Sequence, residues 1–447
     1  MKQGGAGLRI LYLAPTIPYP PDNGMRWALY TNLSYLAPRH EVRLVCRAGG
    51  DESGEPVGVL QRRVGCREVI EFDPDRLGDW ALRSYVTDAL FRACLTSLNL
   101  QRLLPSLCRW AEVIQVENLE LALNLLQVLH ALRLPRRAPI VLRLHDVMSA
   151  VIAERATLDR PSSRLVRRLV PPGLRSALLR RRVAQYRRLE ERIYESVDGI
   201  VAFSREDEVL LHQQAPRARV ACIPLGADPS PPAPRRRLAG GAGPATLTFV
   251  GWMRWPPNAD GAVRFVRDIL PGLSDLDLRV LIVGGDPPPE LRRFDDGVRV
   301  RVLGYVKDLE AVWQSTDVAV VPVRFGTGVK TKTLDALLHG IPVVAYPAGR
   351  RGVAVTPGVD FLEAVTPEAF ADSVRRLLTD PGLYQRIAEN GRMAAVERHS
   401  AAAVGAQLEA FYAELLGAAH NDLPPAAAGL AAARDLSQAS RRDLQSG

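Results

Sequence analysis

Short runs rich in Val, Ile and Leu alternate with helix-length segments along the chain, and this series occurs twice. Strands that are apolar along their whole length are typical of parallel sheets covered by helices on both faces. The pattern therefore predicts an α/β fold with two doubly wound, Rossmann-like domains. The expected strands are 8–14, 41–47, 69–72, 113–117, 140–145, 199–204 and 220–225 in the first series, and 246–250, 278–284, 298–303, 318–323, 342–346 and 361–364 in the second.

A segment rich in proline and glycine separates the two series. Residues 226–243 have no apolar periodicity, which indicates an interdomain linker. We therefore expect an amino-terminal domain over 8–225 and a carboxyl-terminal domain over 244–399, facing each other across a cleft where ligands bind at strand ends. A helical pattern covers 400–418, and residues 419–447 lack a core pattern and are predicted to be disordered.

The composition is that of a soluble globular protein, with 47% apolar and 24% charged residues. The net charge of +9 suits an anionic substrate, an anionic membrane surface or a nucleic acid, and does not choose among them. The five cysteines have no metal-binding spacing, and their odd number argues against a disulfide framework, so we expect reduced thiols in a cytoplasmic protein. No apolar run is long enough to span a membrane or to form a signal peptide.

Arginine is concentrated in one stretch of the amino-terminal half. Residues 155–192 carry twelve arginines, interleaved with leucine and valine. Such a basic amphipathic pattern is compatible with binding to anionic lipid headgroups. A solvated helical face packed on the domain explains it equally well, so both alternatives stay open.

The clearest chemical signal lies in residues 326–345. The protein has only four lysines, and two of them, Lys330 and Lys332, follow a Gly-x-Gly turn at the start of a predicted helix. A glycine turn, a helix amino terminus and an ammonium group together favour binding of a phosphate group. If the helix begins near Gly328, Lys332 and Asp335 share one face and could hold the phosphate and ribose of a nucleotide. An ordinary salt bridge between them is the alternative.

This segment resembles the donor-binding signature of the family 4 glycosyltransferases of the GT-B fold, and especially their exopolysaccharide-associated sugar transferases. The matched pattern is G-T-G-V-K-T-K-T-L-D-A-L-L-H-G-I-P-V-V. The resemblance extends over roughly residues 8–415, because further matches occur in the family's order. They are 18–26, 144–146, 194–195, 201–204 and 223–226 in the first half, and 249–258, 281–284, 302–306 and 317–322 in the second.

The resemblance implies roles for individual residues. The amide of Gly24 is expected to face the diphosphate and the reacting sugar, and His145 to reach the donor sugar. Lys332 is expected to hold the diphosphate, and Asp335 to bind the ribose hydroxyls. The resemblance also implies that 304–306 line the base. The remaining predicted donor-binding residues are Arg254, Gly304, Tyr305, Val306, Gly326, Thr327, Gly328 and Lys330.

The sequence departs from the family pattern at three places. Asp335 stands where the family usually has a glutamate, and Thr327 occupies the position of the other glutamate of that pair. Trp252 and Asn258 stand where many members carry a phosphate-binding arginine and lysine. Arg254 is the candidate replacement for these cations.

The activity that the resemblance implies is that of a retaining glycosyltransferase of the hexosyltransferase type. The donor would be a nucleoside diphosphate sugar, and the acceptor a lipid-linked or polysaccharide sugar. No metal, other cofactor or nucleic-acid partner is expected; the pair Asp73 and Asp75 resembles a metal-binding Asp-x-Asp, but the GT-B fold is generally metal-independent. The expected location is the cytoplasm, with the inner face of the plasma membrane as an open alternative through residues 155–192.

Two other functions fit the same motifs. A nucleotide-sugar epimerase can share the GT-B fold, but it needs acids and bases around the sugar, where the first glycine loop offers only Asp22. A catalytically degenerate nucleotide-sugar binding protein is suggested by Thr327 and Asp335. A dehydrogenase is disfavoured, because no G-x-G-x-x-G follows the first strand of either half.

Overall fold

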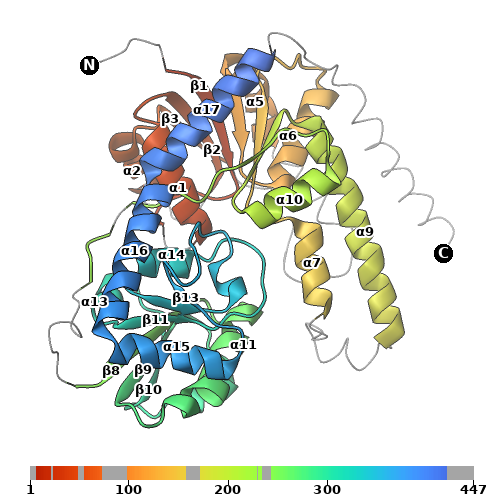
Figure 1. Cartoon of the computed structure of the whole chain (residues 1–447). Coiled ribbons are helices and arrows are strands. Elements are labelled where there is room, and N and C mark those ends of the chain that lie inside the picture. The colour runs from red at the N-terminus through yellow and green to blue at the C-terminus, as the bar shows by residue number, and fades with distance from the viewer. Residues whose placement is uncertain are drawn as a thin grey trace. The chain divides into compact units, whose positions relative to one another are not determined.

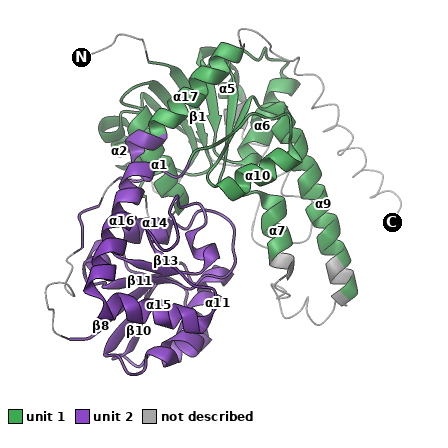
Figure 2. Cartoon of the chain, in the orientation of Figure 1, with its two compact units in different colours: residues 1–223, 405–447 green, residues 224–404 purple. Residues whose placement is uncertain are grey.

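The computed structural model describes residues 7–21, 24–48, 55–72, 98–157, 172–228, 230–233 and 243–419. The chain divides into two compact units (Figure 2). Unit 1 contains residues 1–223 and 405–447, and unit 2 contains residues 224–404. The predicted disordered tail beyond Ala419, most of the predicted linker and the pair Asp73 and Asp75 lie outside the described residues.

Unit 1 is built on a seven-stranded parallel sheet in the order β3-β2-β1-β4-β5-β6-β7. Strands β1 and β2 are parallel, and their paired residues run from Arg9 with Glu41 to Ala14 with Cys46. The strands are β1 Arg9–Ala14, β2 Glu41–Arg47, β3 Glu68–Phe72, β4 Val113–Val116, β5 Ile140–Leu144, β6 Gly199–Ala202 and β7 Val220–Cys222. The helices are α1 Gly24–Leu36, α2 Glu55–Val59, α5 Leu98–Trp110, α6 Leu119–Ala131, α7 Met148–Thr157, α9 Pro172–Ser196, α10 Arg205–Gln214 and α17 Ala401–Ala419, with a π-helical turn at Leu60–Val64 (Figure 1).

Unit 2 repeats this plan with a six-stranded parallel sheet in the order β10-β9-β8-β11-β12-β13. Its strands are β8 Ala245–Val250, β9 Leu278–Val283, β10 Val300–Gly304, β11 Val318–Val321, β12 Val343–Ala345 and β13 Leu362–Glu363. Its α-helices are α11 Pro256–Arg264, α12 Pro289–Arg292, α13 Glu310–Gln314, α14 Thr331–Leu338, α15 Pro367–Thr379 and α16 Pro381–His399. Shorter helical turns cover Phe265–Ile269, Leu270–Leu273 and Pro347–Arg350.

Every strand predicted from the apolar runs is present, and the prediction of two doubly wound parallel sheets is confirmed. Some strand ends differ from the prediction by a few residues, for example where backbone amides donate to a side chain instead of to a neighbouring strand. The strand expected from 298 begins at Val300. The carboxylate oxygen Oδ1 of Asp296 accepts hydrogen bonds from the amides of Val298, Arg299 and Val300 at 2.7–2.9 Å, which holds this stretch in a turn.

The four cysteines among the described residues, Cys46, Cys66, Cys108 and Cys222, are unpaired thiols. Burial raises the pKa of the Cys46 thiol to about 12, so this group is an inert part of the core. None of the helices in the described ranges combines the length and the apolar character that crossing a bilayer requires.

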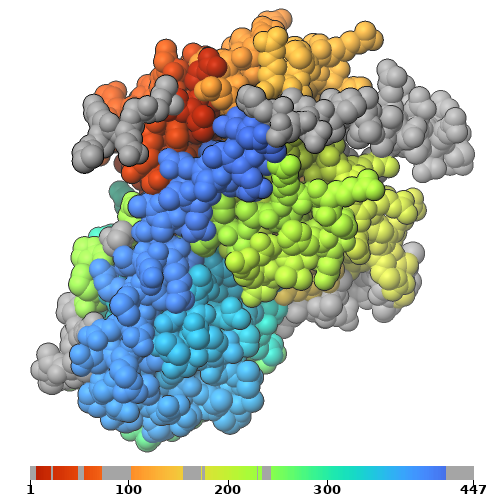
Figure 3. Space-filling view, turned by 45° about the horizontal axis from the view of Figure 1, so that its top comes forward, coloured from red at the N-terminus to blue at the C-terminus, as the bar shows by residue number. Residues whose placement is uncertain are grey.

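Helix α17 is an integral part of unit 1. Figure 3 shows the outer side of this helix, in blue, at the surface. On its inner side, Gly405 lies directly against the ring of Tyr35, and the Tyr35 hydroxyl donates to Glu409 Oε2 at 3.0 Å. The side chains of Phe411 and Leu415 approach Gly199 of β6 so closely that a Cβ there would overlap them. Small residues therefore set the close docking of this helix.

We predict that Gly405→Ala destabilises unit 1, because the added methyl group would overlap the Tyr35 ring. Overpacking of this kind costs about 1–3 kcal/mol, which should lower the thermal unfolding temperature followed by circular dichroism. Gly417→Ala, in the same helix with open space around it, is the matched control and should be neutral or stabilise by about 0.5–1 kcal/mol. Equal melting of the two variants would contradict the close docking.

Candidate functional site

The loop between β11 and α14 is shaped by two glycines and one buried lysine. Gly326 and Gly328 have φ angles of 114° and 73°, in the region that favours glycine. Lys330 is only 6% exposed. Its Nζ donates hydrogen bonds to the carbonyl oxygens of Gly326 at 2.9 Å, Thr327 at 2.8 Å and Gly328 at 2.9 Å. The ammonium therefore closes the turn from the inside.

The structure bears on two expectations about this loop. Lys330 was expected to bind the ligand, which stays a prediction, and its ammonium donates to three carbonyl oxygens of the turn. The helix was expected to begin near Gly328, but it begins at Thr331, because the residues before it form the turn that Lys330 holds. Lys330 is a structural residue of the turn.

Lys332, two residues later, has a different environment. Its Nζ donates to Asn258 Oδ1 at 3.0 Å and lies 5.7 Å from the centre of the Phe249 ring. Burial, and next the charge of Lys330, lower the pKa of the Lys332 ammonium to about 7. No carboxylate forms a salt bridge with Lys332 among the described residues. A bound anion would supply the missing countercharge.

Asn258 connects Lys332 to the loop that follows β8. Its Nδ2 donates to the carbonyl oxygen of Trp252 at 2.9 Å, while its Oδ1 accepts from Lys332. Trp252 is 56% exposed, and its Nε1 donates to Asp286 Oδ2 at 3.1 Å. Arg254 lies exposed in the same loop. A continuous chain of contacts therefore runs from the Lys332 ammonium to the loop after β9.

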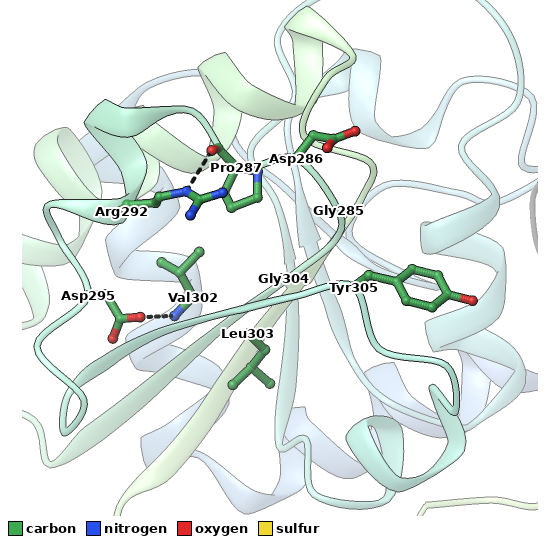
Figure 4. A pocket seen from close by; sticks show the side chains of 9 residues that line it. All are labelled: Gly285, Asp286, Pro287, Arg292, Asp295, Val302, Leu303, Gly304 and Tyr305. Carbon is green, nitrogen blue, oxygen red and sulfur yellow. Dashed lines mark hydrogen bonds between the residues drawn. The ribbon is translucent and has the colours of Figure 1, made fainter.

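The loop after β9 borders a pocket with a volume of about 520 Å³ (Figure 4). Two of the residues expected to line the base, Gly304 and Tyr305, lie in its wall, and Tyr305 is 70% exposed. Val306 packs instead against the apolar cluster of Leu281, Val283 and Val312. The volume falls in the range of small-molecule sites. The other lining residues are Gly285, Asp286, Pro287, Arg292, Asp295, Val302 and Leu303.

Asp335 lies on α14 with its carboxylate held from two sides. Trp313 Nε1 donates to its Oδ2 at 2.7 Å, and His339 Nδ1 lies 3.4 Å from its Oδ1. His339 Nε2 lies 2.9 Å from Glu310 Oε2, which fixes the imidazole in turn. Burial raises the pKa of the Asp335 carboxyl group. The Asp335 side chain keeps 26% of its surface exposed, so it is oriented but still accessible.

The remaining two predicted site residues belong to unit 1. Gly24 is the first residue of α1, and His145 directly follows β5. His145 Nε2 lies 3.2 Å from Oε2 of Glu117, which is fully buried behind β4. Sequence reasoning missed Glu117, as it missed Trp313 and Glu310 around Asp335. A signal for Glu117 was present, because Arg143 in the middle of an apolar strand requires a buried anionic partner.

We predict that replacing the two lysines affects stability to different extents. Lys330→Met leaves three inward-facing carbonyl oxygens without a donor and should cost roughly 2–4 kcal/mol. Lys332→Met loses one hydrogen bond and removes a poorly solvated cation, so it should change stability little at neutral pH. Thermal unfolding of both variants measures the difference. Two variants with equal melting temperatures would contradict the structural role of Lys330.

Comparisons with known proteins find similarity to glycosyltransferases. Residues 244–380 match the protein family described as Glycosyl transferases group 1. The D-inositol 3-phosphate glycosyltransferase of Rhodococcus jostii is 27% identical over 215 residues, 43% of this chain and 47% of that protein. An exopolysaccharide phosphotransferase of Streptomyces coelicolor is 24% identical over 415 residues, 88% of this chain and 39% of that protein. The chain thus spans about half or less of the length of these curated relatives.

The fold comparison agrees. The structure of Anabaena HepE in complex with UDP and glucose superposes with a TM-score of 0.62 at 15% identity, covering 91% of this chain and all of that one. At this identity the likeness is one of fold, and the expected GT-B fold is confirmed. The matched sequence segment coincides with most of unit 2, including the Lys330 turn, Lys332 and Asp335. Within this chain, residues 244–380 are similar to the group 1 glycosyl transferases.

Proposed function

We propose that this protein is a glycosyltransferase that uses a nucleoside diphosphate sugar, whose nucleotide part is bound by unit 2. The observation that carries the proposal is the Lys332 ammonium, which lies next to a glycine turn with no carboxylate partner among the described residues. A diphosphate would supply the countercharge. The likeness to HepE, whose structures contain UDP and UDP-glucose, supports this class of donor.

The chemical task is the departure of a nucleoside diphosphate from the anomeric carbon of the sugar. Negative charge builds on the leaving phosphate as the bond breaks, and fixed positive groups lower the barrier. Lys332 would supply a charge, and the amides of the turn at 326–328 would supply dipoles, because its carbonyl oxygens are directed toward Lys330. Arg254 is exposed and free to add a second charge. On this arrangement we propose a reaction that does not require a metal.

The other parts of the donor have candidate contacts as well. The base would occupy the pocket bordered by Gly304 and Tyr305. The exposed Trp252 would lie at the edge of this pocket, because it donates a hydrogen bond to Asp286, which lines it. The ribose would bind Asp335, whose short side chain is braced by Trp313. The resemblance further assigns Gly24 and His145 of unit 1 to the sugar.

The stereochemical course and the acceptor follow from the resemblance alone. We propose retention of the anomeric configuration, with attack from the face that the diphosphate leaves and transfer of the acceptor's proton to that phosphate. We propose a lipid-linked or polysaccharide sugar as acceptor. The Streptomyces relative, which aligns over 88% of this chain, is named for exopolysaccharide and supports that class.

The test of donor binding is a thermal-shift screen against UDP-, GDP-, ADP- and dTDP-sugars, followed by calorimetric titration of the best nucleotide. Affinity should be full below pH 7 and fall as the pH rises, by about tenfold per unit, because the free Lys332 loses its proton around pH 7 and the bound diphosphate favours the charged form. Release of free nucleoside diphosphate with each candidate sugar measures turnover.

Two variants make this test specific. Lys332→Met should lower the affinity and abolish its decline above pH 7, and should reduce kcat/KM by about a hundredfold or more. Lys332→Arg keeps a positive charge at every pH and should bind with no such decline. Unchanged binding by Lys332→Met would overturn the phosphate assignment. Isomerised sugar as the only product would instead support an epimerase, and binding without turnover a binding protein.

Helix α9 carries the basic surface that the sequence suggests for a membrane. It lies side by side with α7 in unit 1 (Figure 1). Residues 172–189 include six arginines and no acidic residue. Arg180, Arg181 and Arg188 are exposed, and Leu178 beside them is 54% exposed. We propose that this surface binds anionic lipid headgroups, which would place the enzyme at the inner face of the plasma membrane.

Flotation with lipid vesicles tests the membrane proposal. The protein should float with vesicles containing phosphatidylglycerol and not with pure phosphatidylcholine. Replacing Arg180, Arg181 and Arg188 by glutamine should reduce binding roughly a hundredfold, at about 1 kcal/mol per arginine near the surface.

The matched control for the flotation replaces three exposed arginines elsewhere, Arg62, Arg301 and Arg386, by glutamine. It removes the same charge, so it should retain most of the binding. Equal losses in the two triple variants would show that only net charge matters and would contradict a specific role for α9.

A further inference from the structure

A fully buried carboxylate lies beneath His145 at the end of β4. Glu117 has no exposed surface, and its two oxygens face different partners. Oε2 lies 3.2 Å from His145 Nε2. Oε1 accepts hydrogen bonds from three donors, one on β4 itself and one on each neighbouring strand. These are Tyr12 Oη at 2.5 Å, Gln115 Nε2 at 2.6 Å and Arg143 Nη1 at 2.8 Å.

The parallel sheet brings these groups together. β4 lies between β1 and β5, so side chains near the carboxyl ends of the three strands meet above the same edge. Arg143 is 1% exposed, and its guanidinium lies 4.8 Å from the centre of the Phe203 ring. The buried carboxylate is therefore neutralised by a buried guanidinium, which is the arrangement that makes a buried ion pair tolerable.

The charge of Glu117 is fixed by these neighbours. Burial alone would raise its pKa, but Arg143 and the hydrogen bond from His145 outweigh burial and lower the pKa to about 2. A carboxylate that stays ionised can only accept hydrogen bonds. His145 must therefore carry a proton on Nε2 to satisfy the contact. With a single proton on the ring, at Nε2, the imidazole has a lone pair on Nδ1.

The imidazole ring is also held in place sterically. The rings of His145 and Phe203 meet edge to face with centroids 5.0 Å apart, and His145 keeps 18% of its side chain exposed. A ring fixed by a carboxylate at one nitrogen and packed on an aromatic neighbour has one orientation and one tautomer. Its other nitrogen is available to a ligand.

We propose that Glu117 is the positioning residue of His145, holding the Nε2–H tautomer so that Nδ1 accepts a hydrogen bond from a hydroxyl of the donor sugar. This inference rests on the proposed function, in which His145 contacts that sugar. It assigns the histidine the role of a fixed hydrogen-bond acceptor. No proton leaves the network in this step, and Glu117 itself stays ionised.

The network extends to the carboxyl-terminal helix. The Tyr412 hydroxyl of α17 donates to Gln115 Oε1, while Gln115 Nε2 donates to Glu117. Because an ionised carboxylate only accepts, Glu117 fixes which end of the Gln115 amide faces it, and the Tyr412 hydroxyl contacts the other end.

The direct test is nuclear magnetic resonance of protein labelled with ¹⁵N-histidine, with the His145 signals assigned by comparison with His145→Asn. The wild-type protein should show the Nε2–H tautomer. Glu117→Gln should switch His145 toward the Nδ1–H tautomer, because the amide group of glutamine can donate to Nε2. A wild-type Nδ1–H tautomer, or an unchanged tautomer in Glu117→Gln, would overturn the proposal.

Kinetics separate a positioning role from a purely structural one. Glu117→Gln should lower kcat roughly 10–100-fold, as loss of a partner that orients a histidine does. Its affinity for the free nucleotide should stay unchanged, since the nucleotide binds unit 2. The matched control is Glu112→Gln. Glu112 directly precedes β4, and its carboxylate forms a solvent-accessible ion pair with Arg9, so this variant should leave kcat unchanged. Equal kcat values in the two variants would contradict the proposal.

Two arms keep the test decisive. Glu117→Gln leaves Arg143 without its countercharge, and if that variant does not fold, Glu117→Asp replaces it. Aspartate keeps the negative charge beside Arg143 but is one methylene shorter, so it should loosen the contact with His145 Nε2 and give a smaller loss of kcat with a mixture of His145 tautomers. Full kcat and an unchanged tautomer in Glu117→Asp would then count against the proposal. If the wild-type protein turns over no nucleotide sugar, the proposed function fails, while the tautomer measurement still decides whether Glu117 fixes His145.

Discussion

The three hydrogen bonds of the Lys330 ammonium are the interaction on which the site in unit 2 depends. A turn with two left-handed glycines directs three carbonyl oxygens inward, where neither sheet nor helix supplies donors. A single ammonium group with three rotatable donors satisfies all three oxygens from one point. The planar fork of arginine spreads its donors and cannot converge in this way. This geometry explains why a chain with 58 basic residues, almost all arginine, has a lysine at this position.

The two units differ in whether a charged side chain has a countercharge beside it. In unit 1, Glu117 is paired with Arg143, so its charge is permanent and can hold His145 in place. In unit 2, Lys332 has an amide oxygen and an aromatic ring for neighbours, so its charge is costly until an anion arrives. A compensated ion is suited to orienting another side chain, whereas an uncompensated ion is suited to binding a ligand. The contrast follows from the partners, which are Arg143 of β5 for Glu117 and Asn258 of α11 for Lys332.

The strands were predictable because parallel strands buried on both faces are continuous apolar runs, as Val318–Val321 illustrates. The start of β10 was not, since it depends on the Asp296 side chain binding backbone amides. The sequence identified the Gly-x-Gly turn and both lysines, but it could not separate the roles of Lys330 and Lys332. That distinction depends on a helix start three residues later than expected. Long-range partners such as Glu117 and Trp313 leave no periodic trace in the sequence.

The neutral side chain of Asn258 sets the electrostatic environment of Lys332 in unit 2. A cation there would repel the Lys332 ammonium, which already lies beside Lys330. The amide instead accepts from Lys332 and donates to the Trp252 carbonyl, so it fixes the lysine without adding charge. Trp252, in turn, is anchored to Asp286 at the edge of the pocket. Under the proposed function, a site with fewer cations than the pattern it resembles would concentrate its response to an anion in one residue, Lys332, whose position is set by Asn258.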